Sequence, residues 1–413
     1  MISKKDTKFL EQLINKFSSH EDEKINQYPL LEKGFTKEDI IKGMEVLLSR
    51  KLTMSDITRK FEKAFSKFVG SKYALMVNSG SSANLLAAFA LINPKKKGRL
   101  KSGDKFIIPA ICWSTSLWPL VQCGLKPEFI DVNINNFCIN ENLLKKNSSV
   151  KAIMNIHILG NSPNMDKVQS FAKLNNMFLI EDTCEALGSK FKSKYLGTFG
   201  DFGTYSFYYS HQITSGEGGM IVCKTKDDYD LLYTMRSHGW DRGLNSSKKK
   251  NNFNFINSGF NLRPMDLTAA IGLSQLKRLK KMIKSREKNR KLIINKIQNH
   301  KNWNEQFDFF YPIKKLKPSW FGLPLLINKK LNIKKEKFIK YLNLNGVETR
   351  PILSGNFLNQ PSCKLYGFSF DKKNFQISQE IEDRGFFIGL PTSDISPDKL
   401  NFLTEKLLKI KDY

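Results

Sequence analysis

Residues 206–219 read SFYYSHQITSGEGG and contain the most informative residue of the chain, His211. Ser206 stands five residues before it, and the closing Gly-Glu-Gly-Gly run permits a tight backbone path. An imidazole takes up and releases protons near neutral pH, so a histidine in such a loop is a candidate for proton transfer. No lysine occurs between Lys194 and Lys224, so no neighbouring amine can easily replace this side chain.

The segments around this loop predict an α/β fold. Short apolar runs that read as buried strands alternate with helical stretches; they lie at 73–77, 105–109, 128–131, 151–157 and 177–181. Such alternation predicts a largely parallel central sheet with right-handed crossover connections.

The rest of the chain predicts helices before this sheet and a smaller α/β unit after it. Helical spacing of apolar residues occurs near residues 9–17, over 36–69 in two parts, and over a long stretch at roughly 265–299. Beyond it come strand-like runs at 321–327 and 347–352 and helical runs at 335–344 and near 397–410. We expect a leader helix in 1–28, a large domain in 29–265, and a linking helix with a small C-terminal domain in 266–413.

Composition indicates a globular enzyme of the cytoplasm. The 413 residues, 40% of them hydrophobic, suffice for a sizeable core and two domains. The first residues lack an apolar signal-peptide core, and no stretch approaches the roughly 18 apolar residues that span a bilayer. The six cysteines are scattered without a CxxC pair, so we expect them reduced and expect no metal site.

The formal net charge of +28 by itself suggests a polyanionic partner. The basic residues are spread along a chain that is also rich in asparagine and isoleucine, which favours a background residue bias over a nucleic-acid groove. The runs 95–97 and 248–250 lie among turn-forming residues, so we expect them in exposed loops. A nucleotide diphosphate would still be attracted by such a charge.

Two segments place polar residues directly after predicted strands. NSGSSAN at 78–84 precedes an apolar helical run, and the N-terminus of such a helix offers N–H groups to a phosphate, although an ordinary capping turn has the same pattern. LIEDTCEALG at 179–188 places Asp182 at the carboxyl end of a strand, where α/β sheets bind ligands. A carboxylate there can cap a helix or pair with a protonated ring nitrogen.

The spacing of 29 residues between Asp182 and His211, together with the flanking sequence, resembles the DegT/DnrJ/EryC1/StrS family of sugar aminotransferases. The resemblance covers most of the chain from about residue 28. It implies the pyridoxal-phosphate (PLP) dependent transferase fold type I, similar to aspartate aminotransferase, and a homodimer. In that family a lysine at the position of His211 forms a Schiff base to PLP, which an imidazole cannot do.

The same resemblance implies roles for individual residues. Asp182 would pair with the cofactor pyridine nitrogen and Trp113, in PAICWST, would stack on the ring. Glu185 would reach the ring oxygen or the substrate. The phosphate would be bound by Ser206, by Asn261 of the partner subunit, from SGFNLRPMD, and by the turn residues Gly80, Ser81 and Ser82.

Within the family the chain resembles the dehydratase branch, through His211, RSHGWDRG at 236–243 and ETRPILSGNFLNQP at 348–361. That branch implies pyridoxamine phosphate (PMP) as a dissociable coenzyme, His211 as the catalytic base, and GDP-4-keto-6-deoxy-D-mannose as substrate. L-Glutamate would be the amino donor and ammonia would be released, as in dideoxysugar and O-antigen synthesis. His238, Arg350 and Asn356 are candidate substrate contacts. Gln212 departs from the second histidine expected there.

Three alternatives differ in chemistry. An ordinary aminotransferase needs the missing lysine. A CDP-4-keto-6-deoxyglucose 3-dehydrase needs a [2Fe-2S] cluster, and residues 224–362 contain no cysteine, so we expect no cluster. A noncatalytic PLP or sugar-nucleotide regulator would have no need of Asp182, Glu185, Ser206 and an imidazole together.

Overall fold

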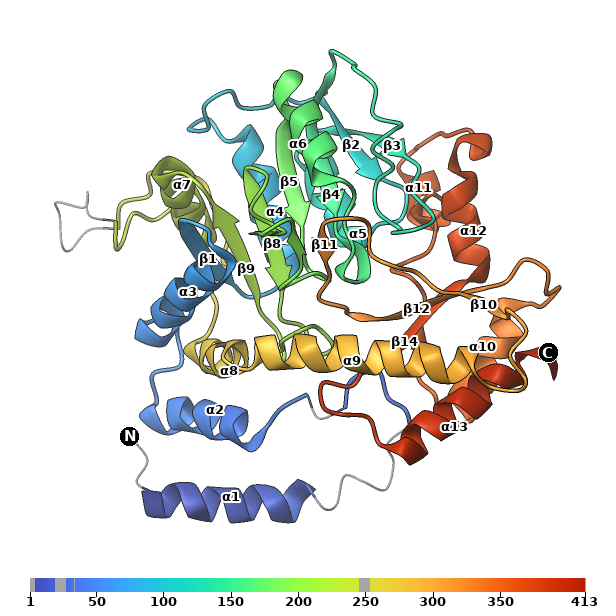
Figure 1. Cartoon of the computed structure of the whole chain (residues 1–413). Helices are drawn as coiled ribbons and strands as arrows, with labels where there is room; N and C mark the ends of the chain where they lie inside the picture. Colours follow the sequence, from blue (N-terminus) through green and yellow to red (C-terminus); the bar gives the residue numbers. More distant parts are fainter. Residues whose placement is uncertain (1–3, 19–26, 33, 245–252, 413) are drawn as a thin grey trace.

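The centre of the protein, seen here in a computed structural model that describes residues 4–18, 27–32, 34–244 and 253–412, is a seven-stranded sheet (Figure 1). The strand order is β1-β9-β8-β5-β4-β2-β3; β9 is antiparallel to both neighbours and the other pairs are parallel. This confirms the largely parallel α/β sheet. The strands are β1 (Tyr73–Val77), β2 (Lys105–Pro109), β3 (Lys126–Ile130), β4 (Val150–Ile156), β5 (Phe178–Asp182), β8 (Phe202–Ser206) and β9 (Gly219–Cys223).

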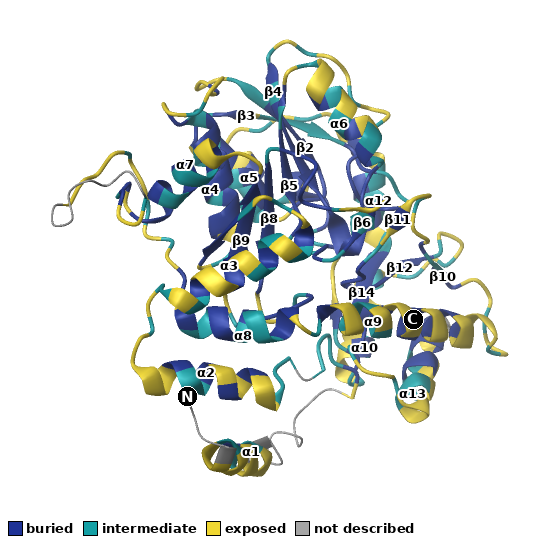
Figure 2. Cartoon of the chain, turned by 60° about the vertical axis from the view of Figure 1, so that its left-hand side comes forward, coloured by how far each residue is buried: buried dark blue, intermediate teal, exposed yellow. Residues whose placement is uncertain are grey.

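Helices cover both faces of this sheet, so its strands are buried between two layers (Figure 2). Alternate residues of β2 show the division: Phe106 and Ile108 pack toward one layer, while Ile107 packs toward the other. The first layer contains α4 (Gly80–Ile92), α5 (Ser114–Gln122) and α7 (Lys226–Arg236), and the second contains α3 (Asp56–Val69), α6 (Met165–Leu174) and α8 (Asp266–Leu276).

A second, antiparallel sheet of four strands has the order β10-β12-β14-β13. Its strands share a hydrophobic core with three helices. The strands are β10 (Phe307–Asp308), β12 (Gly322–Ile327), β13 (Thr349–Arg350) and β14 (Gly385–Gly389), and the helices are α9 (Leu279–Gln298), α10 (Lys335–Leu344) and α13 (Pro397–Leu408).

Shorter elements complete the described chain. A three-stranded sheet has the order β11-β6-β7, and α1 and α2 lie below the body in Figure 1. These elements are β6 (Lys190–Phe191), β7 (Lys194–Tyr195), β11 (Leu316–Lys317), α1 (Lys4–Ser18), α2 (Lys37–Ser49), α11 (Pro361–Leu365) and α12 (Gln376–Arg384), with 3-10 helices at Ile158–Gly160, Phe357–Asn359, Lys372–Phe375 and Lys409–Asp412.

Two predicted elements are wrong in extent. The helical stretch 265–299 is two helices, because the helix is interrupted at Lys277 and Arg278, and Arg278 forms an ion pair with Asp39 of α2. The predicted strand 347–352 is a strand only at Thr349–Arg350. Pro351 has no N–H to continue the ladder. On the other side, Val347 forms a parallel bridge with Tyr28, in which the Tyr28 N–H donates to the Gly346 carbonyl oxygen and the Glu348 N–H donates to the Tyr28 carbonyl oxygen.

The predicted division into domains at residues 28 and 265 stays a prediction. The basic run 95–97 occupies a turn after α4, whereas the run 248–250 lies outside the described residues. Across the described ranges, no helix is both long and apolar enough to cross a membrane.

Candidate active site

A cavity of about 1780 Å³ lies where the parallel strands β1, β2, β4, β5 and β8 reach their carboxyl ends. Ligands of α/β sheets bind at this edge, because the loops that follow the strands converge there. Its lining brings together eight residues that the sequence predicts for the site: Gly80, Ser81, Trp113, Asp182, Glu185, Ser206, His211 and Arg350.

The turn before α4 and the end of β8 form a narrow cradle in the cavity wall. Ser79 caps α4, since its hydroxyl oxygen accepts a hydrogen bond from the Ser82 N–H at 3.0 Å. A Cβ on Gly80 would lie 2.5 Å from Ser206 Cβ and 3.0 Å from Ser206 Oγ, so only glycine permits this close approach. Helix N-terminal N–H groups and hydroxyls are the donors that phosphate uses. The cradle therefore fits a phosphate group.

Asp182 lies almost fully buried at the end of β5 and still lines the cavity. Its Oδ2 accepts hydrogen bonds from Asn84 Nδ2 at 2.8 Å and Ser116 Oγ at 2.7 Å. Its Oδ1 accepts one from the Cys184 N–H at 3.1 Å. Three donors thus hold the carboxylate in one orientation, in which it can pair with a protonated ring nitrogen.

Glu185 lines the cavity three residues further on, and its Oε2 accepts a hydrogen bond from the Leu159 N–H at 2.9 Å. Burial raises the pKa of Glu185 to about 7; the charge of Asp182 acts in the same direction and the Leu159 N–H acts against it. A carboxyl group with such a pKa can donate or accept a hydrogen bond near neutral pH.

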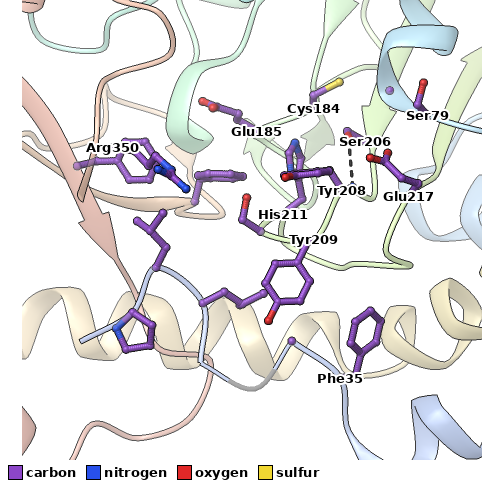
Figure 3. Close-up of a pocket in the computed structure, with 18 of the residues that line it drawn as sticks. Phe35, Ser79, Cys184, Glu185, Ser206, Tyr208, Tyr209, His211, Glu217 and Arg350 are labelled. Atoms are coloured by element: carbon purple, nitrogen blue, oxygen red, sulfur yellow. Dashed lines mark hydrogen bonds between the residues drawn. The ribbon is translucent and has the colours of Figure 1, made fainter. Parts of the chain in front are cut away.

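His211 follows β8 in the loop that leads to β9 and lies beside Tyr208 and Glu185 in the cavity (Figure 3). Two aromatic rings pack against the imidazole in T-shaped contacts. The centroid of the imidazole is 5.1 Å from that of Phe321, at an interplanar angle of 88°, and 5.8 Å from that of Tyr208, at 87°. Its Nδ1 is buried and has no hydrogen-bond partner among the described residues. The imidazole as a whole lines the cavity.

The environment of His211 favours its neutral form. Burial lowers the pKa of His211 to about 3, and the positive charge of Arg286 from α9 acts in the same direction. At neutral pH the imidazole can therefore accept a proton, and once charged it releases the proton readily. The pKa values of His211 and Glu185 are displaced in opposite directions, a pattern typical of acid–base sites.

Comparison with known proteins agrees with this geometry. Residues 35–405 match the DegT/DnrJ/EryC1/StrS aminotransferase family, which is most of the chain. The chain belongs to this family.

Individual relatives are similar over nearly their whole length. GDP-4-keto-6-deoxy-D-mannose 3-dehydratase of Escherichia coli O55:H7 is 36% identical over 392 residues, which cover 92% of this chain and 99% of the relative. A crystal structure of GDP-4-keto-6-deoxymannose-3-dehydratase, a histidine-to-asparagine mutant with bound GDP-perosamine, is 36% identical with a TM-score of 0.85 and covers 92% of this chain and 100% of its own. Another, with a trapped PLP-glutamate geminal diamine, is 34% identical with a TM-score of 0.84 and covers 92% and 100%.

Four residues that the family resemblance predicts for the site do not line this cavity: Ser82, His238, Asn261 and Asn356. The Ser82 hydroxyl oxygen accepts a hydrogen bond from the Ser79 hydroxyl at 2.9 Å. Asn356 is buried, and its Oδ1 accepts a hydrogen bond from the Leu358 N–H, so it caps a 3-10 helix. The remaining two are exposed: His238 has a φ of 61°, and Asn261 Oδ1 accepts a hydrogen bond from Arg263 Nε at 3.0 Å.

Several side chains that support the site are missing from the sequence prediction. Asn84 lies within the quoted NSGSSAN motif, and its amide reaches Asp182, so that motif already contained the signal. Phe321 and Arg286 lie more than 70 residues from His211 in sequence, and no local pattern marks them. The described part of the chain contains no group of three or more His, Cys, Asp or Glu that could bind a metal ion.

Proposed function

We propose that this chain removes the C3 hydroxyl group of GDP-4-keto-6-deoxy-D-mannose, using PMP and PLP as the two forms of its cofactor. The observation that carries the proposal is His211: a neutral imidazole faces the cavity from the loop in which family aminotransferases carry lysine. Proton transfer remains available to this side chain, whereas covalent attachment of the cofactor does not. The 36% identity with an enzyme named for this reaction supports the choice of substrate.

The residues of the cavity fit the cofactor at three places. The cradle at Gly80 and Ser206 suits its phosphate, and the Asp182 carboxylate suits its ring nitrogen. The indole of Trp113 is 53% exposed and lines the cavity, so its face is available for stacking. When bound, the cofactor would supply an amine for the sugar carbonyl and an electron-accepting ring that acidifies the adjacent C–H.

The protein's own part is proton transfer by His211. Its Nε2 accepts the proton from the acidified carbon and then donates a proton to the C3 oxygen, which leaves as water. Burial keeps the imidazole neutral at neutral pH, so it is free to accept a proton, and the protonated ring then readily donates one. Glu185 holds its carboxyl group in the same cavity, 2.9 Å from the Leu159 N–H, to hydrogen-bond the ring oxygen or the sugar.

The balanced reaction converts the sugar nucleotide and L-glutamate into the 4-keto-3,6-dideoxy sugar nucleotide, 2-oxoglutarate and ammonia. Glutamate supplies the two electrons that replace the C–O bond by C–H. The relatives with bound GDP-perosamine and with a PLP-glutamate adduct support a GDP-sugar and glutamate as the two substrates. We assign Arg350, an exposed cation on the cavity lining, to the nucleotide diphosphate.

We further propose a cytoplasmic homodimer in which Asn261 binds the cofactor phosphate of the partner subunit. Asn261 is exposed and lies outside its own cavity, as expected for a residue that serves a second copy. His238, exposed in the same part of the chain, is assigned to the partner's substrate on the same argument. Asn356 then acts indirectly, by holding the segment that follows Arg350.

The test is incubation of the purified protein with PLP, L-glutamate and GDP-4-keto-6-deoxy-D-mannose, with mass spectrometry of the sugar and an ammonia assay. We expect loss of the C3 oxygen and one ammonia per turnover. A product carrying a C4 amine would instead indicate an aminotransferase. Activity only with a CDP-sugar and an added reductase would indicate the iron–sulfur type.

A companion variant, His211→Lys, tests the residue directly. We expect it to bind PLP covalently, seen as a mass increase after borohydride reduction, and to lose dehydration by at least about a hundredfold, the size of a general acid–base contribution. The wild-type protein treated in the same way is the control and should retain no covalent cofactor.

A further inference from the structure

Four buried polar atoms, on His211 and on residues of segments that pack near it, have no hydrogen-bond partner among the described residues. They are His211 Nδ1, Gln212 Oε1, Ser319 Oγ and Arg286 Nη1. A buried polar atom without a partner destabilises the folded state, so four of them on neighbouring segments call for an explanation.

Hydrogen bonds and close approaches bring the segments that carry these atoms next to one another. Gln212 is fully buried, and its Nε2 donates to the Glu185 carbonyl oxygen at 2.5 Å and to the Ser319 carbonyl oxygen at 3.3 Å. Its amide therefore joins the segment after β5 to the segment before β12, directly beside His211. Phe321, two residues after Ser319, contacts the imidazole ring at a centroid distance of 5.1 Å.

Helix α9 passes close to Ser319. A Cβ placed on Gly188 would lie 3.3 Å from Ser319 Oγ and 2.5 Å from Ile283 Cδ1, so the Ser319 hydroxyl lies against this helix. Arg286 stands one turn after Ile283 and is 1% exposed, and its Nε donates a long hydrogen bond to the Leu390 carbonyl oxygen at 3.3 Å. The positive charge of Arg286 helps to lower the pKa of His211.

The four atoms include both hydrogen-bond donors and acceptors, as a bound water requires. Arg286 Nη1 can only donate and Gln212 Oε1 can only accept, whereas Ser319 Oγ and an imidazole nitrogen can do either. A buried water typically makes about three hydrogen bonds to such otherwise unsatisfied groups. A water that accepts from Arg286 has one lone pair and two hydrogens left, which suit a histidine N–H, the Gln212 oxygen and the Ser319 oxygen.

We propose that ordered water behind His211 joins its Nδ1 to Ser319 Oγ and Gln212 Oε1, and so fixes the tautomer with hydrogen on Nδ1 and a free lone pair on Nε2. Ser319 and Gln212 are thus positioning residues, which act on the reaction only through His211. Gln212 stands where the family resemblance leads us to expect a second histidine, and this arrangement gives it a role. It supplies an acceptor that cannot itself take a charge.

The charged and titratable groups around the imidazole agree with this assignment. Arg286 acts on the ring from α9, Tyr208 contacts it from its own loop, and Glu185, from the segment after β5, lines the same cavity. The Arg286 cation opposes a second proton on the ring, so the ring is held neutral while the water selects which nitrogen carries its one hydrogen. The role of Nε2 as proton acceptor rests on the proposed function, whereas the water and the tautomer do not.

The first test uses the resting wild-type protein without substrate. A crystal structure at a resolution that shows ordered solvent should contain water within hydrogen-bonding distance of His211 Nδ1 and Ser319 Oγ. In ¹⁵N-histidine NMR, His211 should show a protonated Nδ1 and an unprotonated Nε2 at neutral pH. A dry space behind the ring, or the opposite tautomer, would overturn the proposal even if the protein proves to be an active dehydratase.

The second test compares Ser319→Ala with Ser189→Ala. Ser189 is an equally buried serine of the same region, but its hydroxyl already donates to the Gly160 carbonyl oxygen at 2.8 Å and accepts from the Ser319 N–H at 2.8 Å. Ser319→Ala should mix the His211 tautomers and lower kcat about tenfold, the effect of one lost hydrogen bond, with KM unchanged. Ser189→Ala should lower the melting temperature and leave the tautomer and kcat as in wild type. Equal effects of the two variants on kcat and on the NMR signals would contradict the proposal.

Discussion

Replacing His211 with asparagine should make the cofactor-free protein more resistant to mild acid. The folded protein lowers the pKa of His211 from 6.5 to about 3. Between these two values the unfolded chain binds a proton that the folded chain does not. Falling pH therefore favours the unfolded state, and the stability lost in this window should return when the imidazole is removed.

The size of the effect follows from the width of the window. Each pH unit below 6.5 costs the folded state about 1.4 kcal/mol, so at about pH 5 the imidazole destabilises the protein by roughly 2 kcal/mol relative to about pH 7.5. Glu185 acts with the opposite sign. Burial raises its pKa from 4.5 to about 7, so it favours the folded state as pH falls through 7. Glu185 is present in both proteins, and its contribution cancels in their difference.

The assay is urea unfolding of wild type and His211→Asn at about pH 7.5 and about pH 5, with free energies from linear extrapolation. The variant should gain about 2 kcal/mol on wild type between the two conditions. The exposed His238, replaced in the same way, is the matched control. A difference between wild type and His211→Asn that stays constant over this range would refute the assignment of a buried, neutral imidazole.

Two further predictions concern packing at the site. Gly80→Ala places a Cβ 2.5 Å from Ser206 Cβ, so it should destabilise the protein by about 1–3 kcal/mol, measured by thermal unfolding. It should also weaken PLP binding, measured by fluorescence titration. Unchanged PLP affinity would argue against the phosphate cradle. Phe321→Leu removes the ring that meets His211 edge to face, a contact worth about 0.5–1.5 kcal/mol, and should lower kcat more than it changes KM. Phe386→Leu, in the core of the second sheet and not on the cavity lining, should not show this split.

The local sequence was sufficient for the elements that carry the large sheet. The five predicted strands correspond to β1–β5, each starting within two residues of its predicted position. Four of them are largely buried and read as apolar runs, whereas β3 is a partly exposed edge strand. Strands β8 and β9, which flank the His211 loop, are absent from the prediction; the FGTYS of β8 mixes glycine and hydroxyl residues with its aromatics and has no such run. The break at Lys277 was also hidden, since the apolar stripe continues across it.

The sequence by itself determined the family, the strand end that carries Asp182, and the presence of an imidazole in place of a lysine. These are properties of short segments, in which backbone pattern and residue type are set locally. Only the tertiary structure decided what the imidazole can do, because its pKa depends on burial and on Arg286, and its ring packs against Phe321, which the chain brings to His211 from distant positions. Desolvation and electrostatic interaction act through space, so a sequence pattern around His211 contains no record of them.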